Sequence, residues 1–332
     1  MSNTKDATTS VGTATAGESN VRLGKCPVCD SKEVVDFLVA PDRFHLRNVV
    51  YRLVRCLSCT CVWLADPPKS QDMGLHYDED YHKAIVKAGE GSAEIRWKNQ
   101  RNIISRYKNG GRLLDIGCSS GGFLSTMKGT DWQLFGIEME PSTAQRAKSA
   151  SGAEVFVGDA VEALFPEGSF DVITSFDVLE HVYDPVQFLT KVLEWLKPGG
   201  IFYAILPNIS SWEARIFGTY WYGLELPRHL FHFSPRSVRS LMNLLGLEEV
   251  YLATPPWSYA EYSLGYVLSN LQETLGLSTV SLAKRQSQGF IWKAMRKSWR
   301  LIFLAPWAHI TSLADAGPSM HLVFRKPTAD SE

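Results

Sequence analysis

The 332-residue sequence has no excess of charge of either sign, with 34 lysine and arginine residues against 35 aspartate and glutamate residues. A dominant nucleic-acid footprint needs a basic excess, so a nucleic-acid partner is not expected. The sequence also lacks a signal-peptide core and an apolar run of the roughly 18 residues that a membrane-spanning helix needs. We therefore expect a globular protein of the cytoplasm.

Cysteine is scarce, with six residues in all, and a cytoplasmic protein keeps them as thiols. Four of them form two Cys-x2-Cys pairs, which are Cys26 with Cys29 and Cys56 with Cys59. Two such pairs are typical of a structural zinc site, in which four thiolates leave no open position for a reacting water. We predict a zinc ribbon with these four ligands and with Cys61 as a spare thiol. The alternative is that the cysteines are buried without a metal.

A glycine-rich loop follows an expected buried strand over residues 112–116, and a helical run follows the loop from Phe123. The loop, Gly117-Cys-Ser-Ser-Gly-Gly122, lacks the Gly-x-Gly-x-x-Gly spacing of dinucleotide sites, which disfavours a dehydrogenase. It instead places Asp115 at the end of the strand. A carboxylate at this place suits a cationic ligand such as S-adenosylmethionine.

Carboxylates also follow the next two expected strands. The strand over residues 132–137 leads to Glu138, which could accept hydrogen bonds from both ribose hydroxyls. The strand over residues 154–157 leads to Asp159, a candidate partner of the adenine amino group. Taken singly, Asp159 could be a turn residue and Glu138 merely exposed. Together they favour a nucleoside site, because open α/β sheets bind ligands at the carboxyl ends of their strands.

The segments LLDIGCSSGGFL, FGIEMEP, GDA, FDVITSFDVLEHV and LKPGG follow one another over residues 112–206 and resemble class I S-adenosylmethionine-dependent methyltransferases. The resemblance implies an α/β fold with a doubly wound, mostly parallel seven-stranded sheet. It implies contacts of the loop with the methionine part, of Glu138 with the ribose and of the residues after it with adenine. Ser119 stands where many members have a third glycine. The expected cofactor-binding residues are Asp115, Gly117, Cys118, Gly121, Glu138, Met139, Asp159, Ala160 and Phe176.

Histidines are the candidates for the base that methyl transfer to a hydroxyl needs, because their pKa lies near neutrality. The first choice is His229, at the end of a segment that follows the fifth expected strand. The second is His181, which follows the fourth strand and could equally position a loop. His232 is flanked by phenylalanines and is interpreted as a packed structural residue. Three tyrosines could orient an acceptor: Tyr77, Tyr81 and Tyr222.

The layout also resembles methyltransferases that carry an N-terminal zinc ribbon and act on sugars, including deoxysugar C-methyltransferases. The resemblance implies that Tyr81 and His229 surround a sugar nucleotide. Arg228 takes the place of a glutamate of that group, so O-methylation and C-methylation both stay open. The expected acceptor is a small molecule, a saccharide or sugar nucleotide. The alternatives are an RNA guided by the ribbon, a quinone or lipid precursor, or a catalytically silent protein that keeps the cofactor fold.

The rest of the chain completes the expected plan. A helix is expected from Asp184 to the segment 196–200, with strands over 201–206, 248–253 and 320–326. Residues 290–304 have apolar side chains at helical spacing among basic ones, which predicts a helix that packs on the sheet or contacts an anionic membrane surface. The expected segments are a disordered tail (1–20), zinc ribbon (21–66), linker and helical cap (67–111), methyltransferase domain (112–255), helical insertion (256–319), and last strand and tail (320–332).

Overall fold

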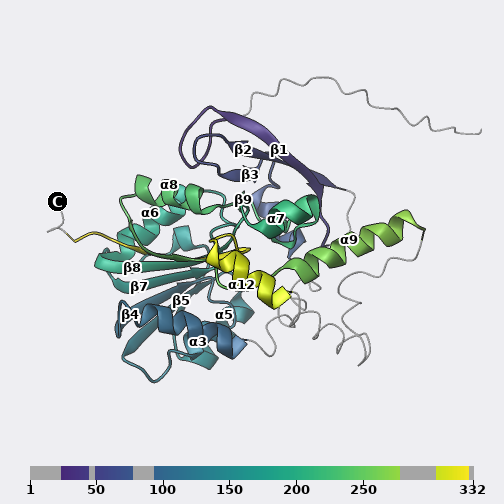
Figure 1. Ribbon diagram of the computed structural model, residues 1–332. Coiled ribbons are helices and arrows are strands. Elements are labelled where there is room, and N and C mark those ends of the chain that lie inside the picture. The colour runs from purple at the N-terminus through teal and green to yellow at the C-terminus, as the bar shows by residue number, and fades with distance from the viewer. Residues whose placement is uncertain (1–23, 45–48, 78–92, 277–303, 329–332) are drawn as a thin grey trace, which may run out of the picture.

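The computed structural model describes residues 24–44, 49–77, 93–276 and 304–328 (Figure 1). These residues form a seven-stranded sheet with helices on both faces and a smaller four-stranded sheet. Among the helices described, none is long and apolar enough to cross a membrane.

The large sheet has the strand order β10-β11-β8-β7-β4-β5-β6. Strands β4 to β8 pair in parallel, and β11 is antiparallel to both of its neighbours. The chain reverses its direction of winding between β4 and β7, which is the switch point where open α/β sheets bind ligands. The predicted fold class is confirmed. The strands are β4 (Gly111–Ile116), β5 (Trp132–Glu138), β6 (Glu154–Val157), β7 (Phe170–Phe176), β8 (Leu196–Pro207), β10 (Glu248–Ala253) and β11 (Ser319–Arg325).

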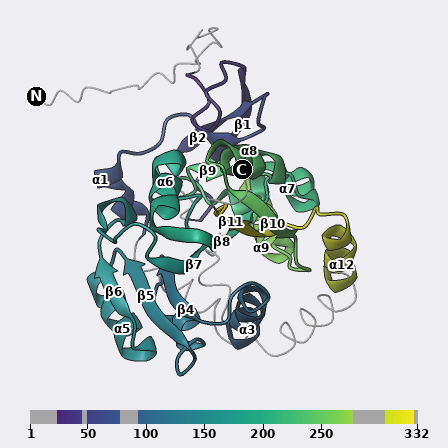
Figure 2. The same ribbon diagram turned by 90° about the vertical axis from the view of Figure 1, so that its left-hand side faces the viewer.

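Alternate side chains of the central strands point to opposite faces of the sheet, so two cores form. Leu114 and Ile173 belong to the core that also contains α6 and α8, whereas Leu113 and Val172 belong to the core with α3 and α5. Figures 1 and 2 show these helix pairs on opposite sides of the sheet. The helices are α3 (Ala93–Ile104), α5 (Pro141–Ser151), α6 (Pro185–Trp195) and α8 (Pro235–Leu244).

The predicted helix starts are confirmed, but two boundaries differ from the prediction. The side chain of Asp184 caps α6, and that of Ser234 forms a capping box on α8. Residues 196–200, expected to end a helix, already belong to β8, because Pro198 has no N–H to continue a helix. The helix after the glycine loop, α4 (Gly122–Ser125), has only four residues, so it is shorter than the sequence suggested.

The small sheet has the order β1-β2-β3-β9, with all pairs antiparallel. Its first three strands belong to the cysteine-containing segment, which we call the cysteine module (residues 24–66). Its fourth strand comes from the segment after the large sheet's fifth parallel strand. The sheet therefore joins parts of the chain that are far apart in sequence. The strands are β1 (Val34–Pro41), β2 (Val50–Cys56), β3 (Val62–Leu64) and β9 (Phe231–His232).

Short elements connect these layers. After the cysteine module come α1 (Ser70–Met73) and η1 (Gly74–His76), and η2 (Ala160–Glu162) follows β6. The predicted basic helix over 290–304 lies outside the described residues except for Leu304, as does the predicted tail 1–20. The segment after β8 and the described insertion contain α7 (Trp212–Phe217), η3 (Gly218–Tyr220), η4 (Tyr222–Leu224), α9 (Ala260–Thr274) and α12 (Ala305–Leu313).

Candidate active site

The glycine loop after β4 has three residues in the left-handed region, with φ of 73° at Gly117, 49° at Ser119 and 79° at Gly121. Serine thus adopts the turn conformation in which many family members have glycine. At Gly121 a Cβ would also lie 2.9 Å from the Cα of Ala147 in α5. Only glycine allows the loop to approach α5 this closely.

Asp115, at the carboxyl end of β4, is 4% exposed. Its carboxylate accepts a hydrogen bond of 2.7 Å from the hydroxyl of Thr174 on β7. Burial raises the pKa of Asp115 to about 7; the hydrogen bond from Thr174 opposes this rise and the charge of Glu138 adds to it. A buried carboxylate of this kind favours a cationic neighbour, which would restore its charged form.

Glu138 ends β5 beside the glycine loop. Its carboxylate accepts hydrogen bonds from the N–H of Ser119 (2.9 Å) and from the N–H of Glu140 (3.0 Å). Asp159, after β6, is exposed and accepts a hydrogen bond of 3.0 Å from the N–H of Val161, so it caps η2. The three carboxylates that the sequence singled out thus follow β4, β5 and β6, which are adjacent in the sheet.

The other expected cofactor residues differ in exposure. Met139 is 69% exposed, whereas Ala160 is buried. Cys118 is buried in the core beneath the loop, where its Sγ would lie 2.7 Å from a Cβ at Gly136. Phe176, half-buried at the end of β7, makes an edge contact with Phe123 at a centroid distance of 5.1 Å. Packing explains the apolar character of Cys118 without a ligand.

A histidine pair lies next to this edge of the sheet. His181, which follows β7, and His229 make an edge contact with ring centroids 4.7 Å apart. The Nδ1 of His181 lies 3.0 Å from both the hydroxyl of Tyr77 and the carbonyl oxygen of Arg228. One ligand atom each from Glu180, His181 and His229 lie within 4.8 Å of one another. Donors gathered in this way can relay a proton or hold a divalent cation.

His229 is buried and has a defined tautomer. Its Nδ1 donates a hydrogen bond of 2.9 Å to the carbonyl oxygen of Gly223, so the neutral ring has Nε2 as its acceptor. Burial lowers the pKa of His229 well below its usual value, and the neighbouring His181 and His232 lower it further. The carboxylate of Glu225 lies 3.5 Å from Nε2. His229 is therefore uncharged at neutral pH but has a carboxylate beside its free nitrogen.

Glu225 also pairs with Arg228, whose side chain is fully buried, at an N–O distance of 3.2 Å. The Nη1 of Arg228 donates to the carbonyl oxygen of His76 at 3.2 Å. The guanidinium lies 4.8 Å from the ring centre of Phe44. Arg228, noted in the sequence only as a departure from a sugar-methylating group, is thus a buried cation next to the histidine pair.

The remaining candidates from the sequence do not join this cluster. Tyr81 lies outside the described residues. Tyr222 packs against other aromatic rings, including that of Tyr262 at 4.8 Å. His232 donates from Nε2 to the carbonyl oxygen of Leu224 at 3.0 Å, and burial lowers its pKa to about 4. These contacts support the interpretation of His232 as a packed structural residue.

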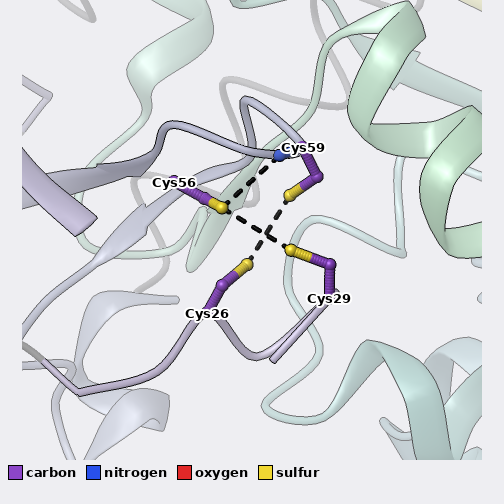
Figure 3. Close-up of side chains that lie close together, drawn as sticks. All are labelled: Cys26, Cys29, Cys56 and Cys59. Carbon is purple, nitrogen blue, oxygen red and sulfur yellow. Dashed lines mark hydrogen bonds between the residues drawn. The ribbon is translucent and has the colours of Figure 1, made fainter. Parts of the chain in front are cut away.

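The four cysteines of the two pairs converge on one point (Figure 3). The Sγ atoms of Cys26 and Cys59 are 3.6 Å apart, as are those of Cys29 and Cys56, and all four lie within 4.8 Å of one another. Cys61 is not in this group, since its Sγ faces the carbonyl oxygen of its neighbour Val62. The predicted set of four thiols is therefore the one that the fold brings together.

Two polar residues of the site were missed in the sequence. Thr174 lies in the middle of an apolar strand and gives no polar signal. Glu225 precedes His229 by four residues, a spacing that puts side chains together on a helix, but the segment was not expected to be helical. The contact between Tyr77 and His181 joins residues 104 apart, which no local pattern predicts.

Comparison with known proteins identifies the family. A family model described as Methyltransferase domain matches residues 95–252. The Ubiquinone biosynthesis O-methyltransferase of Cereibacter sphaeroides is 31% identical over 183 residues, which cover 49% of this chain and 74% of that protein. The chain belongs to the S-adenosylmethionine-dependent methyltransferases.

Further relatives of this methyltransferase agree. The 2-methyl-6-phytyl-1,4-hydroquinone methyltransferase of Synechocystis sp. is 32% identical over 111 residues, covering 32% of this chain and 33% of that protein. A solved S-adenosylmethionine-dependent methyltransferase from Archaeoglobus fulgidus aligns with a TM-score of 0.50 and 19% identity, covering 74% of this chain and all of that one. This last likeness concerns the fold alone. The predicted enzyme class is confirmed, and the names of the sequence relatives include quinone chemistry rather than saccharides.

Proposed function

We propose that this methyltransferase transfers a methyl group to the hydroxyl oxygen of a small ring acceptor, a phenol of the quinone-precursor class. The observation that carries the proposal is the buried, uncharged His229, with its free Nε2 beside Glu225 and its ring against His181. The names of the sequence relatives support this acceptor over the saccharide that the sequence favoured. The balance of charges speaks against the RNA alternative.

The strand-end carboxylates fit S-adenosylmethionine, which supplies an electrophilic methyl group on a sulfonium when bound. We assign Asp115 to the cationic methionine part, because a positive charge beside it offsets the cost of its burial. Each oxygen of Glu138 accepts one backbone hydrogen bond and keeps a lone pair for a ribose hydroxyl. Met139, Asp159 and Ala160 follow the same sheet edge and are assigned to adenine.

In the proposed reaction the acceptor oxygen attacks in line, and its proton passes to the Nε2 of His229. The hydrogen bond to Gly223 holds the ring in the required tautomer. Glu225 stabilises the imidazolium that forms. A histidine whose pKa is lowered is a weak base, and it suits a phenol, with a pKa of about 10, better than the far less acidic hydroxyl of a saccharide.

The cluster of Glu180, His181 and His229 is assigned to proton transfer rather than to a divalent cation. The positive charge of Arg228 acts on both histidines and lowers the pKa of each. The same charge opposes a second cation at this place. His181, held by Tyr77 and by a backbone carbonyl, is assigned to positioning the ring of His229.

We also propose that Cys26, Cys29, Cys56 and Cys59 hold a structural zinc ion. Four sulfurs at about 2.3 Å from a central ion stand roughly 3.8 Å apart in a tetrahedron. The two opposed pairs, each 3.6 Å apart, fit this arrangement. With four thiolates the ion would have no open position, so it would take no part in methyl transfer.

The test is transfer of a labelled methyl group to a catechol and to a sugar nucleotide, each with the His229→Gln variant. We expect transfer to the catechol, and a decrease in kcat of about 10²- to 10⁴-fold in the variant, because this is the usual contribution of a general base. His309→Gln removes an exposed histidine on α12 and is the matched control. Full turnover by His229→Gln would refute the role of His229, and transfer to the sugar nucleotide alone would refute the acceptor class.

A further inference from the structure

The cysteine module shares its sheet with the segment that carries His229. Strand β9, which begins two residues after His229, pairs with β3 so that Trp63 lies opposite Phe231 and Val62 opposite His232. The N–H of Leu64 donates to the carbonyl oxygen of the residue before β9 at 2.9 Å. The module is therefore not a separate unit, because its fourth strand is part of the candidate active site.

Two side-chain contacts fix the second cysteine pair to the start of α8. The hydroxyls of Thr60, directly after Cys59, and of Ser234, the N-cap of α8, are 2.9 Å apart. The guanidinium of Arg236 donates to the carbonyl oxygen of Ser58 at 2.7 Å. Both Ser58 and Thr60 adjoin a cysteine, so the position of the sulfurs sets the position of these contacts.

The other end of the module holds the same segment from its N-terminal side. Arg43, which follows β1, donates from Nε to the carbonyl oxygen of Thr219 at 2.8 Å, and its guanidinium lies 3.7 Å from the ring centre of Tyr220. The adjacent Phe44 contacts the guanidinium of Arg228. The module thus contacts residues 219–220 on one side of His229 and residues 230–236 on the other.

From this geometry we propose that the cysteine module is a clamp for the acceptor site, which holds residues 219–236 so that His229 faces His181 and Glu225. A metal that ties the two cysteine pairs together fixes both ends of the clamp, because the pairs lie at 26–29 and at 56–59, on either side of β1 and β2. The acceptor site then depends on the metal without contacting it. The sheet edge after β4, β5 and β6, where we place the cofactor, makes no such contact with the module and should not depend on the metal.

The consequence for turnover rests on the proposed role of His229, whereas the clamp itself can be tested without turnover. The measurement is backbone hydrogen exchange in the full chain, loaded with zinc and then treated with a chelator. We expect faster exchange over residues 230–233 after zinc removal, with little change over residues 134–137 of β5. Binding of S-adenosylhomocysteine, the demethylated product, should change by less than twofold.

A double variant keeps all four cysteines and removes only the side-chain contacts of the clamp. In Thr60→Val with Arg236→Ala we expect exchange over residues 230–233 to rise about tenfold or more, since two hydrogen bonds no longer hold the segment closed. The control is Arg239→Ala on the same helix, which breaks an exposed ion pair with Glu249 and should leave this exchange unchanged.

Two results would overturn the clamp. One is unchanged exchange over residues 230–233 in the double variant, and the other is equal acceleration in the Arg239→Ala control. If the chelator unfolds the whole chain, the double variant decides, because its metal site is intact. Faster exchange together with full turnover in His229→Gln would leave the clamp standing and refute the proposed base, so the two failures can be told apart.

Discussion

The affinity of the free enzyme for S-adenosylhomocysteine should depend on pH through Asp115. Burial raises the pKa of this carboxyl to about 7, and the ammonium group of the ligand should bind its ionised form. With that pKa the ionised fraction falls from about nine-tenths at pH 8 to about one-tenth at pH 6. The dissociation constant should therefore be about tenfold larger at pH 6 than at pH 8.

Titration calorimetry at the two pH values measures this change, and Asp115→Asn is the matched variant because it keeps the shape of the side chain and removes its charge. The variant should bind more weakly than the wild type at pH 8, with a dissociation constant that changes less than twofold between pH 6 and pH 8. A tenfold change that persists in Asp115→Asn would assign the titration to another group. A wild-type affinity independent of pH would refute the placement of the cation beside Asp115.

The same pKa fixes the sign of a stability effect in the enzyme without ligand. Because the pKa of Asp115 is raised by folding, the stability that it contributes is fully present below about pH 4 and is lost as the pH rises through about 7. Urea unfolding of the wild type and of Asp115→Asn should therefore differ increasingly between pH 5 and pH 8, with the wild type losing more stability. Parallel pH profiles of the two proteins would contradict the buried state of this carboxyl.

Three further predictions concern separate parts of the molecule. Gly121→Ala should destabilise the fold by about 1 to 3 kcal/mol more than Gly152→Ala, because both residues have positive φ but only the first would press a Cβ into α5, as urea unfolding can measure. Glu138→Ala should weaken S-adenosylhomocysteine binding in calorimetry by about tenfold to a hundredfold through loss of two charged hydrogen bonds; unchanged binding would exclude the ribose contact. Metal analysis should find one zinc per chain, lost in Cys26→Ser and kept in Cys61→Ser; zinc loss in both would make Cys61 a ligand.

Local patterns predicted the sheet and its helix starts well. The strand over residues 248–253 has the expected bounds, because apolar side chains and turn residues delimit it within a few positions. The side chains of Asp184 and Ser234 cap α6 and α8 because each is followed by a proline at the first helical position. The glycine loop and its carboxylates were also accessible, since each follows a strand directly in sequence.

Contacts between distant segments were not accessible from the sequence. Strand β9 has two residues, too few for an alternating pattern, and forms only because β3 offers a free edge. The division at residue 66 between ribbon and linker remains a prediction, although the hydrogen bonds of β3 with β9 tie the ribbon to the later domain. The pairing of Glu225 with Arg228 and its closeness to His229 likewise depend on how the segment after β8 folds back.

The central claim is methyl transfer to a phenolic hydroxyl with His229 as the base, and one measurement tests it most directly. Purified enzyme is incubated with labelled S-adenosylmethionine and a catechol, and the label in the methyl ether is followed against pH for the wild type and His229→Gln. The account predicts transfer to oxygen by the wild type, already active at pH 6 because the pKa of His229 is lowered, and a loss of at least about a hundredfold in the variant. Equal rates for the two proteins, or label on carbon instead of oxygen, would contradict it.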